Sequence, residues 1–220
     1  MAKKKLVRFT ENLSYPHLFQ PRYEELKPAF WLKGRWGQDV FKNDHPITLE
    51  LGCGKGEYTI GLARQHRNRN FIGIDIKGAR LWRGCRTVEE EQLANVVFIR
   101  SRADHLESFF DAGEVSEIWI TFPDPQPGKE RKRLTAPLFL QRYCKIMKPP
   151  GIIHLKTDDR ELFGYTKETL RQYPSEILME TEDLYRDYPG EPVSTIQTHY
   201  ESIWLEQGKR IAYIRFRLTP

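Results

Sequence analysis

Residues 46–56 read Pro-Ile-Thr-Leu-Glu-Leu-Gly-Cys-Gly-Lys-Gly, a short apolar run that ends in three closely spaced glycines. The residues that follow, 57–66, have the apolar spacing of a helix. This order predicts a strand, a tight loop and a helix, because glycines permit a turn in which the backbone approaches a ligand. Taken alone, the loop also fits a purely structural turn or a dinucleotide-binding loop.

The same alternation of strand and helix continues along the chain. It implies βαβ crossovers, and hence an open, doubly wound, Rossmann-like α/β fold with a mostly parallel seven-stranded sheet and an antiparallel last strand. We expect strands at 47–51, 70–75, 95–101, 116–121, 151–157, 176–185 and 210–218, with helices at 57–66, 79–94, 105–113, 136–149, 161–174 and 199–208.

Residues 1–45 differ from the rest in being rich in Lys, Arg, aromatic residues and Pro, without a sustained period. We expect an extended, basic N-terminal arm and capping segment ahead of a single catalytic domain at 46–220. The arm is either a disordered tail with a segment that covers the core, or part of a substrate-binding surface.

Composition limits the classes of protein to consider. Lys and Arg outnumber Asp and Glu by 35 to 30 in 220 residues, an excess that suits a polyanionic partner without requiring one. No run approaches the ~20 apolar residues of a membrane span, and the start lacks the apolar segment of a signal peptide. Three scattered cysteines form neither a disulfide framework nor a zinc motif, so we expect a cytoplasmic protein.

Two acids indicate which nucleoside cofactor the first loop binds. Asp75 ends the next strand about 20 residues after the glycines, where a carboxylate accepts both hydroxyls of a ribose. Glu50, directly ahead of the glycines, would repel a pyrophosphate but suits a cation. S-adenosylmethionine carries an ammonium and a sulfonium, and the loop resembles that of class I methyltransferases. We expect Glu50, Gly52, Gly54, Gly56 and Asp75 to bind this cofactor.

The ends of the third and fourth strands complete the predicted site. In the class I fold the third loop flanks the adenine, often with an acid. Arg102 occupies that place here, followed by Ala103 and Asp104, so either Asp104 or the backbone makes the contact. In the fourth loop, prolines on both sides of Asp124 fix it at the sheet edge, facing the transferable methyl. The alternative for Asp124 is a solvated turn residue.

The segments ELGCGKGEYT, GIDIKGARLWRG, FPDPQP, KRLT, HLKTDD and THYE together resemble successive motifs of the bacterial tRNA (guanine-N7)-methyltransferases. The resemblance implies methyl transfer from S-adenosylmethionine to N7 of guanine 46 in the tRNA variable loop, with Asp124 as the catalytic position and S-adenosylhomocysteine as the product. It also implies tRNA as the partner, with no obligate protein partner, in a monomer or homodimer. The scattered histidines have no i, i+4 pairing and transfer from a sulfonium needs no metal, so we expect no metal site. Two departures stand out: Gln126 replaces a usual Trp, and Gly128 stands where a Lys is usual, leaving Lys129 as its stand-in.

The resemblance also implies a set of substrate contacts, each with a structural alternative. Asp158 could instead cap the helix that begins near Arg160, although Asp159 can fill that role. A basic run beside the site is suited to phosphates, but such runs are often merely solvated. Thr198 and Glu201 could form a capping box, and Tyr200 could pack in the core. The expected substrate-binding residues are Lys129, Arg131, Lys132, Arg133, Asp158, Thr198, Tyr200 and Glu201.

Two other functions compete with this one. A methyltransferase for a small molecule or a protein would be expected to carry lid insertions and would need no basic run beside its site. A non-catalytic RNA-binding subunit that keeps the fold would be expected to have lost Glu50, Asp75 or Asp124. The chain retains all three acids and the basic run.

Overall fold

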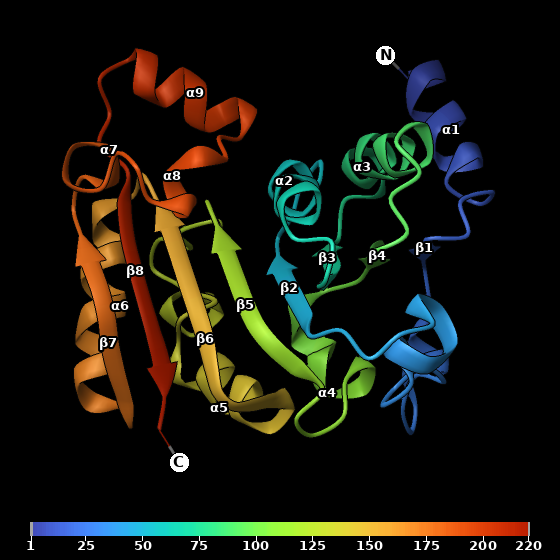
Figure 1. The fold of residues 1–220 in the computed structure, drawn as a ribbon, viewed down its shortest axis with the longest axis horizontal. Coiled ribbons are helices and arrows are strands. Elements are labelled where there is room, and N and C mark those ends of the chain that lie inside the picture. The colour runs from blue at the N-terminus through green and yellow to red at the C-terminus, as the bar shows by residue number, and fades with distance from the viewer. Residues whose placement is uncertain (1, 220) are drawn as a thin grey trace.

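The computed structural model describes the backbone of residues 2–219 and the side chains of residues 6–219. A twisted sheet crosses the molecule, with helices on both faces (Figure 1). Its strands are β1 (Leu18–Phe19), β2 (Ile47–Leu51), β3 (Asn70–Asp75), β4 (Val96–Arg100), β5 (Val115–Thr121), β6 (Met147–Thr157), β7 (Ser175–Thr181) and β8 (Ala212–Leu218). The α-helices are α1 (Ala2–Glu11), α2 (Glu57–Gln65), α3 (Gly78–Glu90), α4 (Leu106–Phe109), α5 (Pro137–Ile146), α6 (Arg160–Gln172), α7 (Leu184–Asp187), α8 (Pro192–Thr195) and α9 (His199–Glu206).

The order of strands confirms the predicted doubly wound topology. The sheet runs β1-β4-β3-β2-β5-β6-β8-β7, and β8 is antiparallel to both of its neighbours while the other pairings are parallel. The chain first builds outward from β2 to β4 and then returns to the other side of β2 with β5. The loops after β2 and β5 therefore diverge at the centre of the sheet, which is where open α/β folds bind ligands.

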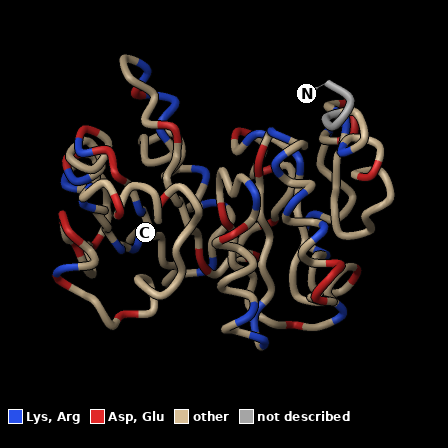
Figure 2. Tube along the Cα trace, turned by 90° about the horizontal axis from the view of Figure 1, so that it is seen from above, with Lys and Arg blue, Asp and Glu red and all other residues tan. Residues whose placement is uncertain are grey.

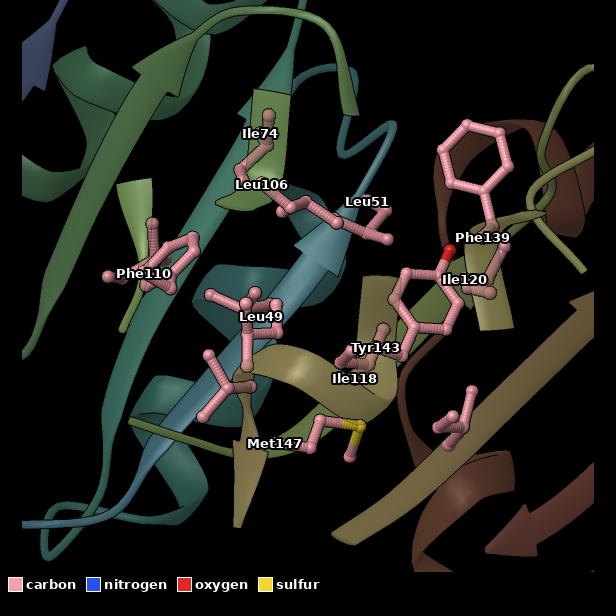
Figure 3. Close-up of a cluster of buried hydrophobic side chains, with 14 of the residues drawn as sticks. Leu49, Leu51, Ile74, Leu106, Phe110, Ile118, Ile120, Phe139, Tyr143 and Met147 are labelled. Carbon is pink, nitrogen blue, oxygen red and sulfur yellow. The ribbon is translucent and has the colours of Figure 1, made fainter. Parts of the chain in front are cut away.

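Both faces of the central strands are buried, as expected for a parallel sheet covered by helices. On one face, Leu49 and Leu51 of β2 pack with Ile118 and Ile120 of β5 and with Tyr143 of α5 (Figure 3). On the other face, the core contains side chains from α2, α3 and β4, including Tyr58, Leu81 and Phe98. Packing on both sides fixes the strands, and so fixes the loops at their carboxyl ends.

The N-terminal segment is more regular than the extended arm that we predicted. Helix α1 packs on α3, where Trp82 donates a hydrogen bond to Glu11 and Arg8 lies 4.6 Å from the Trp82 ring centre. The Asn12 side chain donates to the Gly78 carbonyl over 2.8 Å. Strand β1 then pairs with β4, which makes eight strands in the described sheet where we predicted seven. The expectation of an extended arm is therefore wrong for these residues.

Residues 20–45 cover part of the core on the face of the sheet that also buries Leu49 and Tyr143. Leu26, Phe30, Leu32 and Trp36 are buried there, and the Trp36 indole N–H donates to the Phe109 carbonyl over 2.9 Å. A short helical turn at Trp36–Phe41 brings these rings together. These large rings would otherwise be exposed, and their burial extends the hydrophobic core.

Candidate active site

The loops after the central parallel strands lie at the carboxyl edge of the sheet, and hydrogen bonds from their backbone N–H groups join neighbouring strand ends. Gly54 N–H donates to Asp75 Oδ2 over 2.9 Å, which joins the loops after β2 and β3. Phe122 N–H donates to the Lys156 carbonyl over 2.8 Å, which joins the loop after β5 to β6. The sequence-predicted acids at the ends of these strands are thus placed around one region.

The glycines of the first loop have two different roles. Gly52, Gly54 and Gly56 all have positive φ values of 75°, 59° and 73°, which side chains rarely adopt. A Cβ on Gly52 or Gly54 would meet no atom within 4 Å, so these two residues face open space. A Cβ on Gly56 would lie 2.5 Å from the Phe98 ring, so this glycine allows α2 to pack closely. The loop therefore exposes backbone to a ligand at its centre.

Asp75 is held at the end of β3 by backbone donors. Its two oxygens accept hydrogen bonds from Gly54 N–H and from Lys77 N–H, over 2.9 and 2.7 Å. Each carboxylate oxygen has about two lone-pair positions, so both can accept a second hydrogen bond. This arrangement suits the two adjacent hydroxyls of a ribose.

Glu50 lies beneath the first loop and not at its surface. The residue is 3% exposed, and its carboxylate accepts hydrogen bonds from Thr59 N–H (2.8 Å), from the Thr59 hydroxyl and from the Thr121 hydroxyl. Burial raises the pKa of the Glu50 carboxyl from its ordinary value of 4.5 to about 7, against the effect of these donors. Glu50 thereby ties the first turn of α2 to the end of β5.

Replacing Glu50 with glutamine is expected to make the free energy of unfolding less dependent on pH. The folded state binds the Glu50 proton more tightly than the unfolded chain, because burial raises its pKa. This stabilisation is complete below the ordinary pKa of 4.5, which applies to the unfolded chain, and is lost as the pH rises through about 7. Wild-type stability should therefore fall, relative to the variant, by up to about 1.4 kcal/mol per pH unit in that window.

Urea denaturation of both proteins at several pH values between about 5 and 8 measures this difference. Glu24→Gln is the matched control, because Glu24 is an exposed acid on the N-terminal segment. Parallel pH profiles for wild type and Glu50→Gln would contradict the buried titration.

A small cavity opens beside the ends of β3 and β4. It measures about 210 Å³ and is lined by Pro21, Tyr23, Leu26, Ile76, Arg100, Ser101, Arg102 and His105. Ala103 packs toward the core, and Asp104 pairs with Arg102 (2.8 Å) and Arg142 (3.5 Å). Arg102 lines this cavity, whereas Asp104 is not among its lining residues. We did not predict from the sequence that Pro21 and Tyr23 line this cavity. The aromatic and proline content of the N-terminal segment was the signal that could have indicated it.

The Asp124 loop combines exposure with an unusual backbone. Asp124 is exposed, and one of its oxygens accepts a hydrogen bond from Gln126 N–H over 3.1 Å. Phe122 and Gln126 have φ values of 48° and 50°, which non-glycine residues adopt at some cost in energy. The turn and the functional interpretations of Asp124 are thus compatible, since the turn presents the carboxylate at the sheet edge.

The basic run after this loop divides into exposed and buried residues. Lys129, Arg131 and Lys132 are exposed. The Arg133 side chain is 1% exposed, pairs with Glu161 and donates to the Pro125 carbonyl over 3.0 Å. Our prediction that Arg133 contacts substrate is therefore wrong for this conformation. Its planar guanidinium instead fixes the loop that carries Asp124.

The predicted substrate acids after β6 and in α9 also separate by burial. Asp159 caps α6 by accepting from Leu162 N–H over 2.7 Å, which leaves Asp158 to contact Lys209 at 3.3 Å. Thr198 and Glu201 form the capping box of α9. Glu201 is 0% exposed, so the prediction that it contacts substrate is also wrong here. Tyr200, its neighbour, is 51% exposed.

Glu201 pairs with a buried lysine that the sequence did not indicate. Lys156 of β6 lies 2.7 Å from Glu201, and both side chains are 0% exposed. The Lys156 ammonium also donates to the carbonyls of Val193 and Ile196, each over 3.1 Å. Its pKa is lowered by burial, while Glu201 opposes that effect. The pair fastens α8 and α9 to the sheet.

Residues of both charge signs are spread along the backbone trace. Lys and Arg alternate with Asp and Glu along the trace seen from above (Figure 2). Among the described residues, no three His, Cys, Asp or Glu side chains are grouped so as to hold a metal ion. No helix in the described part of the chain is long and apolar enough to cross a membrane.

Known proteins resemble this chain over its full length. A family model described as a putative methyltransferase matches residues 44–214. The tRNA (guanine-N(7)-)-methyltransferase of Christiangramia forsetii is 53% identical, with 99% of each chain covered. The protein of the same name from Bacteroides thetaiotaomicron is 49% identical over 99% of this chain and 87% of its own.

Solved structures share the fold at low sequence identity. The 16S rRNA methyltransferase KamB aligns with a TM-score of 0.63 and 13% identity, covering 83% of this chain and 92% of its own. This likeness concerns the fold alone. Family membership rests on the sequence relatives and on the family model. The chain belongs to the bacterial tRNA (guanine-N7)-methyltransferase family, a group of class I enzymes that use S-adenosylmethionine.

Proposed function

We propose that this enzyme methylates N7 of guanine 46 in the variable loop of tRNA. The observation that carries the proposal is the position of Asp124, whose exposed carboxylate stands at the end of β5, next to the glycine loop after β2. Relatives with the corresponding name cover nearly the whole chain, which supports the base and the atom that are modified. A tRNA substrate would place the enzyme in the cytoplasm.

The residues at the sheet edge fit S-adenosylmethionine. Asp75 has fixed oxygens for the ribose, Gly52 and Gly54 leave space above the loop, and the cavity beside Arg102 suits the adenine. When bound, the cofactor supplies an electrophilic methyl group on a sulfonium. Glu50 holds the loop in position from beneath through its hydrogen bonds with Thr59 and Thr121.

The residues around Asp124 supply alignment and charge. Guanine N7 has a free lone pair, so no side chain has to remove a proton before the transfer. The Asp124 carboxylate accepts hydrogen bonds from the N1–H and amino group of the base and offsets the positive charge that grows on the ring. Asp158 lies at the end of the neighbouring β6. Lys129, Arg131 and Lys132 are placed to contact phosphates.

A transfer assay with mapped product tests the proposal. Unmodified tRNA and methyl-labelled S-adenosylmethionine are incubated with the protein, nucleosides are identified by mass spectrometry, and borohydride/aniline cleavage locates the site. We expect 7-methylguanosine at position 46, and no product from a transcript with adenosine there. Methylation at another guanine would overturn the position, and no transfer despite bound cofactor would overturn the substrate.

A further inference from the structure

Three aromatic rings form a continuous row from the Asp124 loop across α9. The ring centres of Phe122 and Trp204 are 5.0 Å apart, and those of Trp204 and Tyr200 are 6.1 Å apart with planes inclined by 29°. Tyr200 and Trp204 are separated by four residues and so lie on the same side of the helix. We call Phe122, Trp204 and Tyr200 the aromatic ledge.

Two lysines flank the aromatic ledge, one at its Tyr200 end and one beside the central ring of Trp204. Lys55, in the glycine loop, has its ammonium 5.8 Å from the Tyr200 ring centre. The Lys209 ammonium is 5.4 Å from the Trp204 ring centre and 3.3 Å from Asp158. Aromatic faces interleaved with lysines are typical of surfaces that bind unpaired nucleotides by stacking and by phosphate contacts.

Packing alone does not account for this row of rings. Helix α9 is already attached to the sheet by Glu201, whose carboxylate pairs with Lys156 in a fully buried contact. Tyr200 precedes Glu201 directly and yet is 51% exposed, so its ring does little to anchor the helix. Trp204 is partly buried, with one neighbour in the Asp124 loop. The anchor and the exposed aromatic surface are therefore separate features of one helix.

Methyl transfer at Asp124 requires that the plane of the target guanine be fixed, and the Asp124 carboxylate alone does not fix it. Hydrogen bonds along one edge of guanine fix the direction of that edge but leave the plane of the base free to tilt about it. An in-line transfer to N7 needs the plane fixed as well. A stacked aromatic face fixes a plane, and the aromatic ledge begins two residues before Asp124.

We propose that the aromatic ledge stacks the unpaired target guanine and its neighbouring nucleotide, while Lys55 and Lys209 contact the flanking phosphates. The inference rests on the proposed function and adds to it: the target base leaves its own stack before it is methylated. The target guanine then stacks on Trp204, whose ring contacts Phe122 of the Asp124 loop. The neighbouring nucleotide stacks on Tyr200.

The test compares three variants with the wild-type enzyme. Trp204→Leu removes the stacking face but keeps an apolar side chain, and Trp204→Phe keeps a ring. Trp31→Leu is the matched control, because Trp31 is 61% exposed on the N-terminal segment. For each, kcat and KM for tRNA are measured, with cofactor affinity by calorimetry and the midpoint of thermal unfolding.

Trp204→Leu is expected to lower kcat/KM for tRNA by at least about tenfold, toward the lower end of what stacking contributes per base. Trp204→Phe should lie within about threefold of wild type, and Trp31→Leu should match wild type. Cofactor affinity should be unchanged throughout. Unchanged kcat/KM in Trp204→Leu would overturn the proposal, as would equal losses in both Trp204 variants accompanied by weaker cofactor binding or earlier unfolding.

A second readout locates the stacked base directly. A tRNA with 2-aminopurine next to position 46 should change fluorescence on binding wild type, and less so on binding Tyr200→Leu. Equal changes with both proteins would overturn the assignment of Tyr200. Failure of wild type to methylate tRNA at all would instead overturn the proposed function, so the two failures are distinguishable.

Discussion

Replacing Asp124 with asparagine is expected to lower the rate of methyl transfer by about 10²–10³-fold. The carboxylate offers two acceptors to the N1–H and amino group of guanine, whereas an amide offers one acceptor and meets one donor with its own N–H. The variant also lacks the charge that offsets the cation forming on the ring. Single-turnover rates with labelled S-adenosylmethionine and excess enzyme would measure the loss.

The loss should be confined to chemistry and base recognition. Asp124 is exposed, with one hydrogen bond to the backbone of its own loop, so its removal should leave stability and cofactor affinity within experimental error. Glu130→Gln is the matched control, because Glu130 is another exposed acid a few residues further on. A fully active Asp124→Asn enzyme would remove this side chain from the mechanism.

Replacing Lys156 with methionine is expected to reduce the free energy of unfolding by about 3–5 kcal/mol. The substitution leaves the Glu201 carboxylate without its cation in a site where both side chains are fully buried. It also removes the hydrogen bonds that the Lys156 ammonium donates to the carbonyls of Val193 and Ile196. These bonds attach α8 and the residue after it to β6. Urea denaturation, followed by circular dichroism, would give the difference.

A double variant separates the effect of the lone charge from that of lost packing. Lys156→Met combined with Glu201→Leu removes both charges and should recover much of the lost stability, since a buried ion pair is often replaceable by apolar side chains. Activity should not recover to the same extent, because Thr198 loses its capping partner and α9 its fixed position. A single variant as stable as wild type would contradict the anchoring role.

The sequence predicted the central fold because its signals there are local. Runs such as residues 70–75 and 95–101 are apolar, short and followed by helical spacing, and each became a parallel strand. The N-terminal segment carried no such pattern. Helix α1 packs on α3 through contacts of Glu11 and Arg8 with Trp82, and β1 is a two-residue pairing with β4. Both depend on contacts between distant residues, which periodicity does not report.

The candidate site was predicted where a residue's type alone decides its role. Asp75 after a strand and glycines before a helix have few alternatives, and the structure places them together. Arg133 and Glu201 were assigned to substrate because charged side chains are usually exposed. Their partners, Glu161 and Lys156, lie 28 and 45 residues away in the chain. Spacing along the sequence did not indicate either pair, so burial was not foreseen.

The short strand β1 has a consequence for how copies of this protein meet one another. An open sheet has two unpaired edges, and an uncovered edge invites a strand from another molecule. Here one edge is the two-residue strand β1, and the other is β7, which carries Glu176 and Glu180. Short or charged edges are poor templates for added strands. The N-terminal residues that form β1 therefore also shorten the edge that this side of the sheet offers to an added strand.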